Sequence, residues 1–259
     1  MPPGDSAVPR LPGKFVWADL VTDNLESTRK FYGKLFGWSF QRHGDYLLAF
    51  NRGLPVAGMF QRQRPANQPH ATPRWFGYIS VNDIDHAQRA ALRGGGRLIA
   101  APFDVPDRGR QAVFVDPEGA LFGIIRTSAG DPGDVPATPG GWVWLQYLSR
   151  DAHRAATFYQ SVGGYQIVRD SGPYRTSDFI LRSGDHSRAT VRNLSGVNPA
   201  VRPTWLPFLR VTRLADTIGQ ATRFGGMIVV TPRQNLLNGK AAVIADPTGA
   251  PVGLIEWTN

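Results

Sequence analysis

A few polar side chains interrupt four apolar runs of the sequence, and they are the residues best suited to chemistry. Alternate residues of a β-strand share one face, which groups Trp17, Asp19 and Val21; Phe76, Tyr78 and Ser80; Trp144, Gln146 and Leu148; and Leu206, Phe208 and Arg210. An enclosed Asp19 can act as a general base when its pKa is raised, while Tyr78 and Ser80 can polarise or protonate a bound group. Gln146 and Arg210 suit a carboxylate or another anion.

Each of these polar residues also has a purely structural interpretation. Asp19 and Arg210 are equally compatible with local hydrogen bonds or salt bridges that only stabilise the fold. No competing catalytic motif is present, because Gly94-Gly95-Gly96 follows a predicted helix and ends it instead of forming a phosphate loop. A G-x-S-x-G nucleophile motif is also missing from the sequence.

Composition excludes several classes of function. The chain has no cysteine, which rules out disulfides and thiolate catalysis, and its net charge of +9 favours anionic partners only in a general way. The basic residues are scattered; the pairs Arg62 with Arg64 and Arg108 with Arg110 are predicted to be solvated surface, so no nucleic-acid partner is expected. No apolar stretch is long enough to span a membrane.

An internal repeat divides the chain into two halves. The segment from Gly109 to Ile125 reappears as Gly239 to Ile255, 130 residues further along, and Phe31-Tyr32 reappears as Phe158-Tyr159. The segment between the halves is rich in Gly and Pro, which is typical of a linker. We therefore predict a flexible leader over residues 1–13, a first domain over 14–127, a linker over 128–140 and a second domain over 141–259.

Each half divides again into two units of one strand, one helix and three strands. In the first unit, the pattern predicts a strand over 15–22, a helix from Leu25 that is capped by Asp23-Asn24 and stopped by Gly37, and strands over 38–42, 46–51 and 55–61. In the second, it predicts a helix over 84–92 and strands over 76–81, 97–100, 111–116 and 121–126. Helices over 152–161 and 214–224 follow in the second half. The predicted fold class is α+β, with four βαβββ units paired into two domains.

The strings VWADLVTDNLESTRKFYGKLFGW and FVDPEGALFGII, with their echoes WLQYLSRDAHRAATFY and IADPTGAPVGLI, resemble the vicinal-oxygen-chelate superfamily. This superfamily includes glyoxalases, extradiol dioxygenases and bleomycin-resistance proteins. The resemblance covers nearly the whole chain after residue 13 and implies a tandem form with one cup-shaped pocket in each domain. It leaves the function open, because the fold serves many activities.

Metal-using members of that superfamily carry His or Glu on the first strand of each unit and Glu on the last. Alignment with these members places Trp17, Phe76, Trp144 and Leu206 at the first-strand positions, and Gly58, Gly123, Ala189 and Gly253 at the last-strand positions. None of these side chains binds a divalent metal. The five histidines, His43, His70, His86, His153 and His186, have no ligand spacing and are predicted to lie in loops or at helix starts. No metal or other cofactor is expected.

The sequence leaves three functions open. The first is a metal-independent protein that binds a small apolar, aromatic or anionic molecule next to Trp17, Asp19, Phe76, Tyr78 and Ser80, or next to Trp144, Gln146, Phe208 and Arg210. The second is a cofactor-free enzyme, such as a lyase or isomerase, that acts through Asp19 and Tyr78. The third is a metalloenzyme of the glyoxalase or dioxygenase type. The aromatic residues can instead be core packing. We expect a monomer or homodimer, cytoplasmic unless an export signal has been removed.

Overall fold

The computed structural model describes residues 8–62, 72–172, 177–194 and 201–257. The first half contains β1 (Phe15–Thr22), α1 (Leu25–Phe36), β2 (Ser39–His43), β3 (Tyr46–Asn51), β4 (Leu54–Gln61), β5 (Arg74–Ser80), α2 (Ile84–Arg93), β6 (Arg97–Val105), β7 (Gly109–Val115) and β8 (Leu121–Thr127). The second half contains β9 (Trp142–Ser149), α3 (Ala152–Gly163), β10 (Gln166–Arg169), β11 (Phe179–Ser183), β12 (His186–Asn193), β13 (Thr204–Val211), α4 (Leu214–Arg223), β14 (Met227–Val230), the short 3₁₀ helix η1 (Leu237–Gly239), β15 (Ala241–Ala245) and β16 (Pro251–Glu256). The predicted α+β class with four βαβββ units is confirmed.

Local sequence explains where the helices begin and end. The side chain of Asn24 accepts a hydrogen bond from the backbone N–H of Ser27 at 2.9 Å and so caps α1. Gly37 ends the same helix in the left-handed region, with φ of 70°, which glycine adopts without a steric penalty. In the second half, Asp151 and Gly164 perform the same two roles for α3.

Each half forms one mixed sheet of eight strands. The order is β2-β3-β4-β1-β5-β8-β7-β6 in the first sheet and β10-β11-β12-β9-β13-β16-β15-β14 in the second. In both sheets the first strands of the two units pair antiparallel at the centre, β1 with β5 and β9 with β13. The first and last strands of a unit pair in parallel, as β1 does with β4 and β5 with β8.

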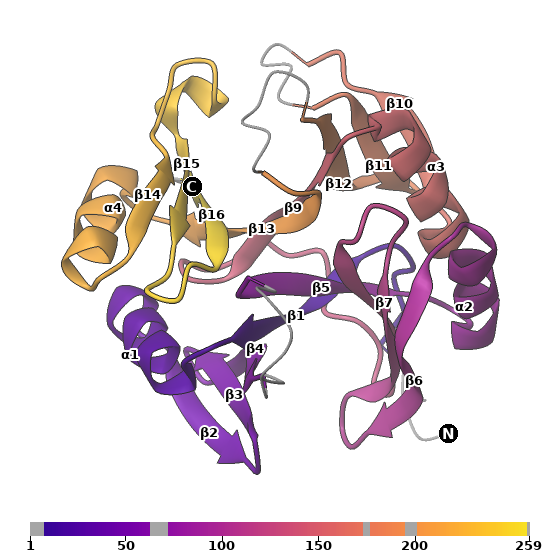
Figure 1. The fold of residues 1–259 in the computed structure, drawn as a ribbon, viewed down its shortest axis with the longest axis horizontal. Coiled ribbons are helices and arrows are strands. Elements are labelled where there is room, and N and C mark those ends of the chain that lie inside the picture. The colour runs from indigo at the N-terminus through magenta and orange to yellow at the C-terminus, as the bar shows by residue number, and fades with distance from the viewer. Residues whose placement is uncertain (1–7, 63–71, 173–176, 195–200, 258–259) are drawn as a thin grey trace, which may run out of the picture.

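The helix-bearing faces of the two sheets are turned toward each other. Helix α1 lies beside α4, and α2 lies beside α3, so each helix pair combines the two halves (Figure 1). The two large hydrophobic clusters follow the same division, because one joins the second and third units and the other joins the first and fourth. The halves therefore share their cores, and the opposite face of each sheet, called here its outward face, is left for other contacts.

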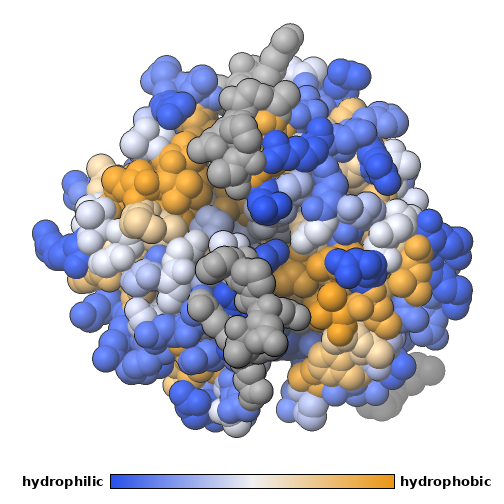
Figure 2. Space-filling view, in the orientation of Figure 1, coloured by the Kyte–Doolittle hydropathy of each residue, from blue (hydrophilic) through white to orange (hydrophobic). Residues whose placement is uncertain are grey.

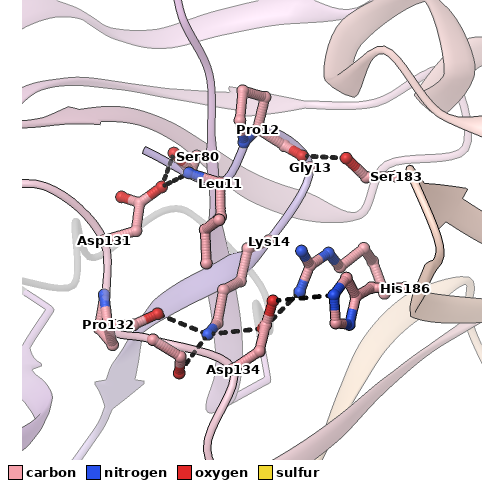
Figure 3. A network of polar contacts seen from close by, with 12 residues as sticks. Leu11, Pro12, Gly13, Lys14, Ser80, Asp131, Pro132, Asp134, Ser183 and His186 are labelled. Atoms are coloured by element: carbon pink, nitrogen blue, oxygen red, sulfur yellow. Dashed lines mark hydrogen bonds and ion pairs between the residues drawn. The ribbon is translucent and has the colours of Figure 1, made fainter. Parts of the chain in front are cut away.

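Polar contacts hold residues 128–140, the predicted linker, in place (Figure 3). The Asp131 carboxylate accepts a hydrogen bond from Ser80 Oγ at 2.6 Å, as Figure 3 shows. It also accepts one from Thr127 Oγ1 at 2.8 Å, and Asp131 is only 1% exposed. Asp134 pairs with Lys14 at 2.9 Å and with Arg188, on the second sheet, at 2.6 Å. These bonds connect the linker to both halves.

The segment before β1 also joins the two halves. The Pro12 carbonyl accepts a hydrogen bond from Ser183 Oγ at 2.6 Å (Figure 3). The Gly13 carbonyl accepts one from the Tyr165 hydroxyl at 2.6 Å. Residues 1–7 of the expected leader lie outside the described residues.

Exposed apolar side chains gather at two equivalent sheet edges. Figure 2 shows apolar surface around β14 on one side of the molecule and around β6 and β7 on the other. The exposed side chains at these edges are Leu98, Ile99 and Phe103 on β6, and Met227, Ile228 and Val229 on β14. None of the helices in the described part of the chain is long and apolar enough to cross a membrane.

Candidate functional site

The first outward face brings together four residues that the sequence groups by strand alternation. Trp17 lies opposite Tyr78, and Asp19 lies opposite Phe76, where β1 and β5 pair. Phe76 and Tyr78 are buried, and Trp17 packs against them, half-buried, in a small cluster separate from the two large cores. Because β1 and β5 are central strands, each is hydrogen-bonded to a neighbouring strand on both sides, which fixes the backbone around the site.

Asp19 is the polar centre of this face. Its Oδ1 accepts hydrogen bonds from Trp17 Nε1 at 2.8 Å and from the Tyr46 hydroxyl at 2.6 Å, and its Oδ2 accepts one from the Tyr78 hydroxyl at 2.9 Å. The residue is 3% exposed. A buried carboxylate needs such partners, because an unpaired charge away from water is costly.

Arg108 completes the site and was not predicted to belong to it. Its guanidinium lies 4.3 Å from the centre of the Trp17 ring, and its Nη1 lies 3.9 Å from Asp19 Oδ2. Its Nη2 donates a hydrogen bond to the Tyr46 hydroxyl, and its Nη1 donates one to Gln111 Oε1 at 3.2 Å. The prediction that Arg108 is a solvated surface residue is wrong, since its side chain is 15% exposed. The β6–β7 turn carries it over the sheet.

The two tyrosines act as hydrogen-bond donors at neutral pH. Burial raises the pKa of Tyr46 above its ordinary value of 10, the nearby Asp19 charge raises it further, and Arg108 acts in the opposite direction. The pKa of Tyr78 is also raised, first by burial and then by Asp19. Both phenols therefore keep their protons and direct them at Asp19.

Two glycines provide the space that the tyrosines occupy. A Cβ atom on Gly58 would lie 1.5 Å from the Tyr46 hydroxyl oxygen and 2.3 Å from Asp19 Oδ1, and one on Gly123 would lie 2.2 Å from Tyr78 Cδ1. These glycines stand at the last-strand positions, next to Asp19 and Tyr78 in the strand register. Within the described ranges, no three His, Asp or Glu side chains are grouped so that they could hold a metal ion.

The second outward face has the same plan with different chemistry. Trp144 Nε1 donates a hydrogen bond to Thr190 Oγ1 at 3.0 Å, and Gln146 Nε2 donates one to the same oxygen at 3.4 Å. Leu206 and Phe208 are buried there, with Trp144 packed against them. The alignment of Ala189 with Gly58 is wrong: Thr190 lies opposite Gln146, as Gly58 lies opposite Asp19, while Ala189 is buried in the core on the helix side.

Ser80 and Arg210 both contact the linker. Ser80 donates its hydroxyl to Asp131, and Arg210, 130 residues later, donates from Nη1 to the Ala137 carbonyl at 2.7 Å. Arg210 Nε also donates to the Trp257 carbonyl at 3.0 Å. The structure thus places these two candidate ligand contacts beside the linker, at the ends of β5 and β13.

The histidines are dispersed. His43, His86, His153 and His186 are exposed, and His70 lies outside the described residues. His186 begins β12 and is not in the predicted loop; its Nε2 lies 3.7 Å from Asp134 Oδ2.

Comparison with known proteins identifies the family. Residues 14–124 match the model of the Glyoxalase/Bleomycin resistance protein/Dioxygenase superfamily. The anthracycline biosynthesis protein DauV of Streptomyces sp. (strain C5) is 31% identical over 264 residues, covering 95% of this chain and 94% of that protein. CFP32 of Mycobacterium bovis, named as a candidate glyoxylase, is 28% identical and covers 93% of each chain.

The fold is also found in solved structures. The Mn(II)-bound glyoxalase from Novosphingobium aromaticivorans superimposes with a TM-score of 0.63 at 14% identity, covering 95% of this chain and 82% of that chain. The 2,3-dioxygenase LapB from Pseudomonas sp. KL28 superimposes with a TM-score of 0.65 at 11% identity, covering 96% and 94%. With two eight-stranded sheets of paired βαβββ units and these relatives along its full length, the chain belongs to the glyoxalase, bleomycin-resistance and dioxygenase superfamily.

Proposed function

We propose that the protein binds a small planar aromatic molecule with an acidic oxygen on the first outward face, over Trp17 and Arg108. The observation that carries this proposal is the stacking of the Arg108 guanidinium 4.3 Å over the Trp17 ring. A second aromatic ring can stack on the other face of the guanidinium, and an anionic substituent can hydrogen-bond to its N–H groups. Asp19 and Tyr46 hold the guanidinium in this orientation.

The names of two relatives agree with this ligand class. DauV, and DnrV of Streptomyces peucetius, which is 30% identical over 260 residues, are named as anthracycline biosynthesis proteins. Anthracyclines are polycyclic molecules with aromatic rings and phenolic oxygens. A flat ring system of that kind has the shape and the oxygen chemistry that a stacked Trp17 and Arg108 pair favours.

No metal takes part in the proposed binding. Trp17 and Phe76 stand at the first-strand positions, where metal-using members of the superfamily have ligands, and neither side chain coordinates a cation. The space beside Gly58 and Gly123 is filled by Tyr46 and Tyr78. The side chains at these positions do not fit a divalent metal.

Catalysis without a cofactor is the second candidate, favoured by the Tyr78 hydroxyl, which lies 2.9 Å from Asp19 Oδ2. A ligand that took over this bond would place a weakly acidic C–H or O–H next to the carboxylate, which is the arrangement that proton abstraction needs. Conversion of the bound ligand, abolished by Asp19→Asn in a variant that still folds, would distinguish this function from binding alone.

Isothermal titration calorimetry with anthraquinone-2-sulfonate tests the binding proposal. We expect Arg108→Gln to weaken binding of this anionic ring system about tenfold or more, since a charge-assisted contact is lost. Arg110→Gln is the matched control: Arg110 lies in the same hairpin, is 47% exposed and pairs with Asp104. Equal affinities of the two variants, or no binding by the unaltered protein, would refute the proposal.

A further inference from the structure

A cavity of about 560 Å³ lies at one end of the first sheet. Its walls come from the first turn of α1, from the end of β4 and the residue after it, and from β2 and the turn that follows β2. Figure 1 shows α1 next to the β2–β3 hairpin. The volume is within the range of roughly 300–1,000 Å³ that small-molecule sites have in proteins.

The cavity is on the helix side of the strand ends. Gln61, in its wall, lies opposite Thr22, whose hydroxyl is hydrogen-bonded to the Thr28 hydroxyl of α1 at 2.9 Å. Arg42, in another wall, lies opposite Leu47, which belongs to the core between the halves. Residues paired on neighbouring strands point to the same side of a sheet. The cavity is therefore separate from the first outward face, where the proposed function lies.

Two of the carboxylates in the cavity wall already have cationic partners. Asp23 Oδ1 accepts a hydrogen bond from Arg62 Nε at 2.7 Å. Glu26 accepts hydrogen bonds from Arg29 Nε and Nη2 at 2.8 and 2.7 Å, and Lys30 Nζ lies 3.4 Å from it. The bonds from Arg29 lower the pKa of Glu26 to about 2. Both carboxylates are ionised at neutral pH and compensated by the protein itself.

Three other charged groups in the wall keep hydrogen-bonding capacity for a ligand. The Arg42 guanidinium makes one long bond, from Nη1 to the Gly44 carbonyl at 3.5 Å. Arg62 uses its Nε for Asp23, which leaves the terminal nitrogens of its guanidinium, in a side chain that is 17% exposed. The Asp45 carboxylate, in the exposed turn after β2, forms no ion pair with the part of the chain that the structure describes.

The cavity thus presents both signs of charge. Three carboxylates and two guanidinium groups line it, so a simple anion is repelled by the first set and a simple cation by the second. A zwitterion can place its carboxylate against a guanidinium and its ammonium against a carboxylate. The amide groups of Asn24 and Gln61 also line the cavity, and their NH₂ groups can donate hydrogen bonds to a peptide carbonyl.

We propose that this cavity binds a zwitterionic molecule of dipeptide size. The carboxylate of the ligand binds Arg42 and the terminal nitrogens of Arg62, and its ammonium group binds Asp45. Its peptide carbonyl accepts a hydrogen bond from Asn24 or Gln61. The inference goes beyond the proposed function and does not rest on it, because the cavity shares no residue with the site over Trp17.

Calorimetry with L-alanyl-L-glutamine tests the inference, because this dipeptide has one ammonium group, one carboxylate and a polar side chain. N-acetyl-L-alanyl-L-glutamine lacks the ammonium group, and L-alanyl-L-glutaminamide lacks the carboxylate. We expect each capped form to bind the unaltered protein about tenfold more weakly than the zwitterion, since a charge-assisted hydrogen bond is lost. Equal affinities for the three forms would contradict both charged contacts.

Two variants assign the contacts to single residues. Asp45→Asn is expected to weaken binding of the zwitterion about tenfold and not to weaken binding of the acetylated form, which has no ammonium group for Asp45 to bind. Arg42→Gln is expected to weaken binding of the zwitterion in the same way, with little effect on the form that lacks the carboxylate. Both residues are exposed, and circular dichroism verifies that the variants fold.

The second half offers a matched control. Asp185 is exposed in the turn between β11 and β12, in the same Arg-x-Gly-Asp sequence that contains Asp45, and Asp185→Asn is expected to bind as the unaltered protein does. Arg52→Gln, in the exposed turn between β3 and β4, is the control for Arg42→Gln. No binding of L-alanyl-L-glutamine by the unaltered protein, or equal affinities of Asp45→Asn and Asp185→Asn, would overturn the inference.

Discussion

Asp116 in the first half accepts a hydrogen bond from the hydroxyl of Tyr159 in the second, at 2.7 Å, and both residues are buried. The same hydroxyl accepts a hydrogen bond from Trp205 Nε1 at 2.8 Å. Asp116 belongs to the Asp-Pro-Glu-Gly turn and Tyr159 to the Phe-Tyr pair, two of the repeated motifs of the sequence. The most distinctive motifs therefore connect the two halves and lie outside the proposed ligand site.

Tyr159→Phe is expected to lower the free energy of unfolding by about 2 kcal/mol, because it leaves a buried carboxylate oxygen and an indole N–H without their partner. Urea unfolding followed by tryptophan fluorescence measures the change. Tyr165→Phe, which loses a single bond to the neutral Gly13 carbonyl, is the matched control and should cost less. A larger loss in the control would contradict this account of the interface.

Asp246, the counterpart of Asp116, gives a prediction about pH. Burial raises the pKa of Asp246 above its ordinary value of 3.8, and its Oδ2 has no hydrogen-bond partner. With a raised folded pKa, the folded state binds the proton more tightly than the unfolded state, so the stabilisation is full below the unfolded pKa and is lost as pH rises through the folded pKa. Asp246→Asn removes this loss.

We therefore expect the free energy of unfolding of the unaltered protein to fall relative to that of Asp246→Asn as the pH rises above the ordinary aspartate pKa of 3.8. The side-chain amide oxygen that Asp246→Asn introduces can keep the Oδ1 bonds from the Thr248 and Ala250 backbone N–H groups. Asp116→Asn serves as the comparison and should be less stable at every pH, because the Asp116 Oδ2 accepts the Tyr159 bond. Parallel stability curves for the unaltered protein and Asp246→Asn would disprove the expectation.

The fold could be predicted from the sequence because its determinants are local or repeated. Asn24 and Gly37 fix the ends of α1, and the constant spacing of the repeated motifs fixes the order of the four units. Strand β6 was predicted to end at Ala100 but continues to Val105. Register shifts near Ala100 and Phe103 interrupt the alternation on which the sequence prediction rests.

Only part of the candidate site could be predicted. Trp17, Asp19 and Tyr78 follow from alternation within single strands, but Tyr46 and Arg108 reach Asp19 from other segments. Sequence patterns predict that a charged residue in a turn is solvated. This prediction is wrong for Arg108 and also for Arg62, because the Arg62 side chain is 17% exposed and pairs with Asp23 at 2.7 Å. Contacts across a curved sheet depend on tertiary structure that strand periodicity does not contain.

Gly58 offers a test of the packing around Asp19. Gly58→Ala places a methyl group where the Tyr46 hydroxyl lies, and we expect a loss of about 1 to 3 kcal/mol in the free energy of unfolding. The double variant Gly58→Ala with Tyr46→Ala removes the clash with Tyr46 and leaves only the contact of the methyl group with Asp19 Oδ1. Its loss of stability should therefore be smaller than the sum of the losses in the two single variants, as measured by urea unfolding. Additive losses would show that the methyl group is accommodated elsewhere.

Asp19→Asn tests whether the buried carboxylate orients the ligand-binding arginine. The substitution removes the negative charge that lies 3.9 Å from Arg108 and places an amide N–H group among three hydrogen-bond donors. We expect Arg108 to lose its fixed position over Trp17 and the affinity for anthraquinone-2-sulfonate to fall about tenfold. Asp104→Asn, which removes the carboxylate partner of Arg110 in the same hairpin, is the control and should bind as the unaltered protein does. Tighter binding by a folded Asp19→Asn variant would instead mean that Asp19 repels the anionic probe and that its charge does not serve to position Arg108.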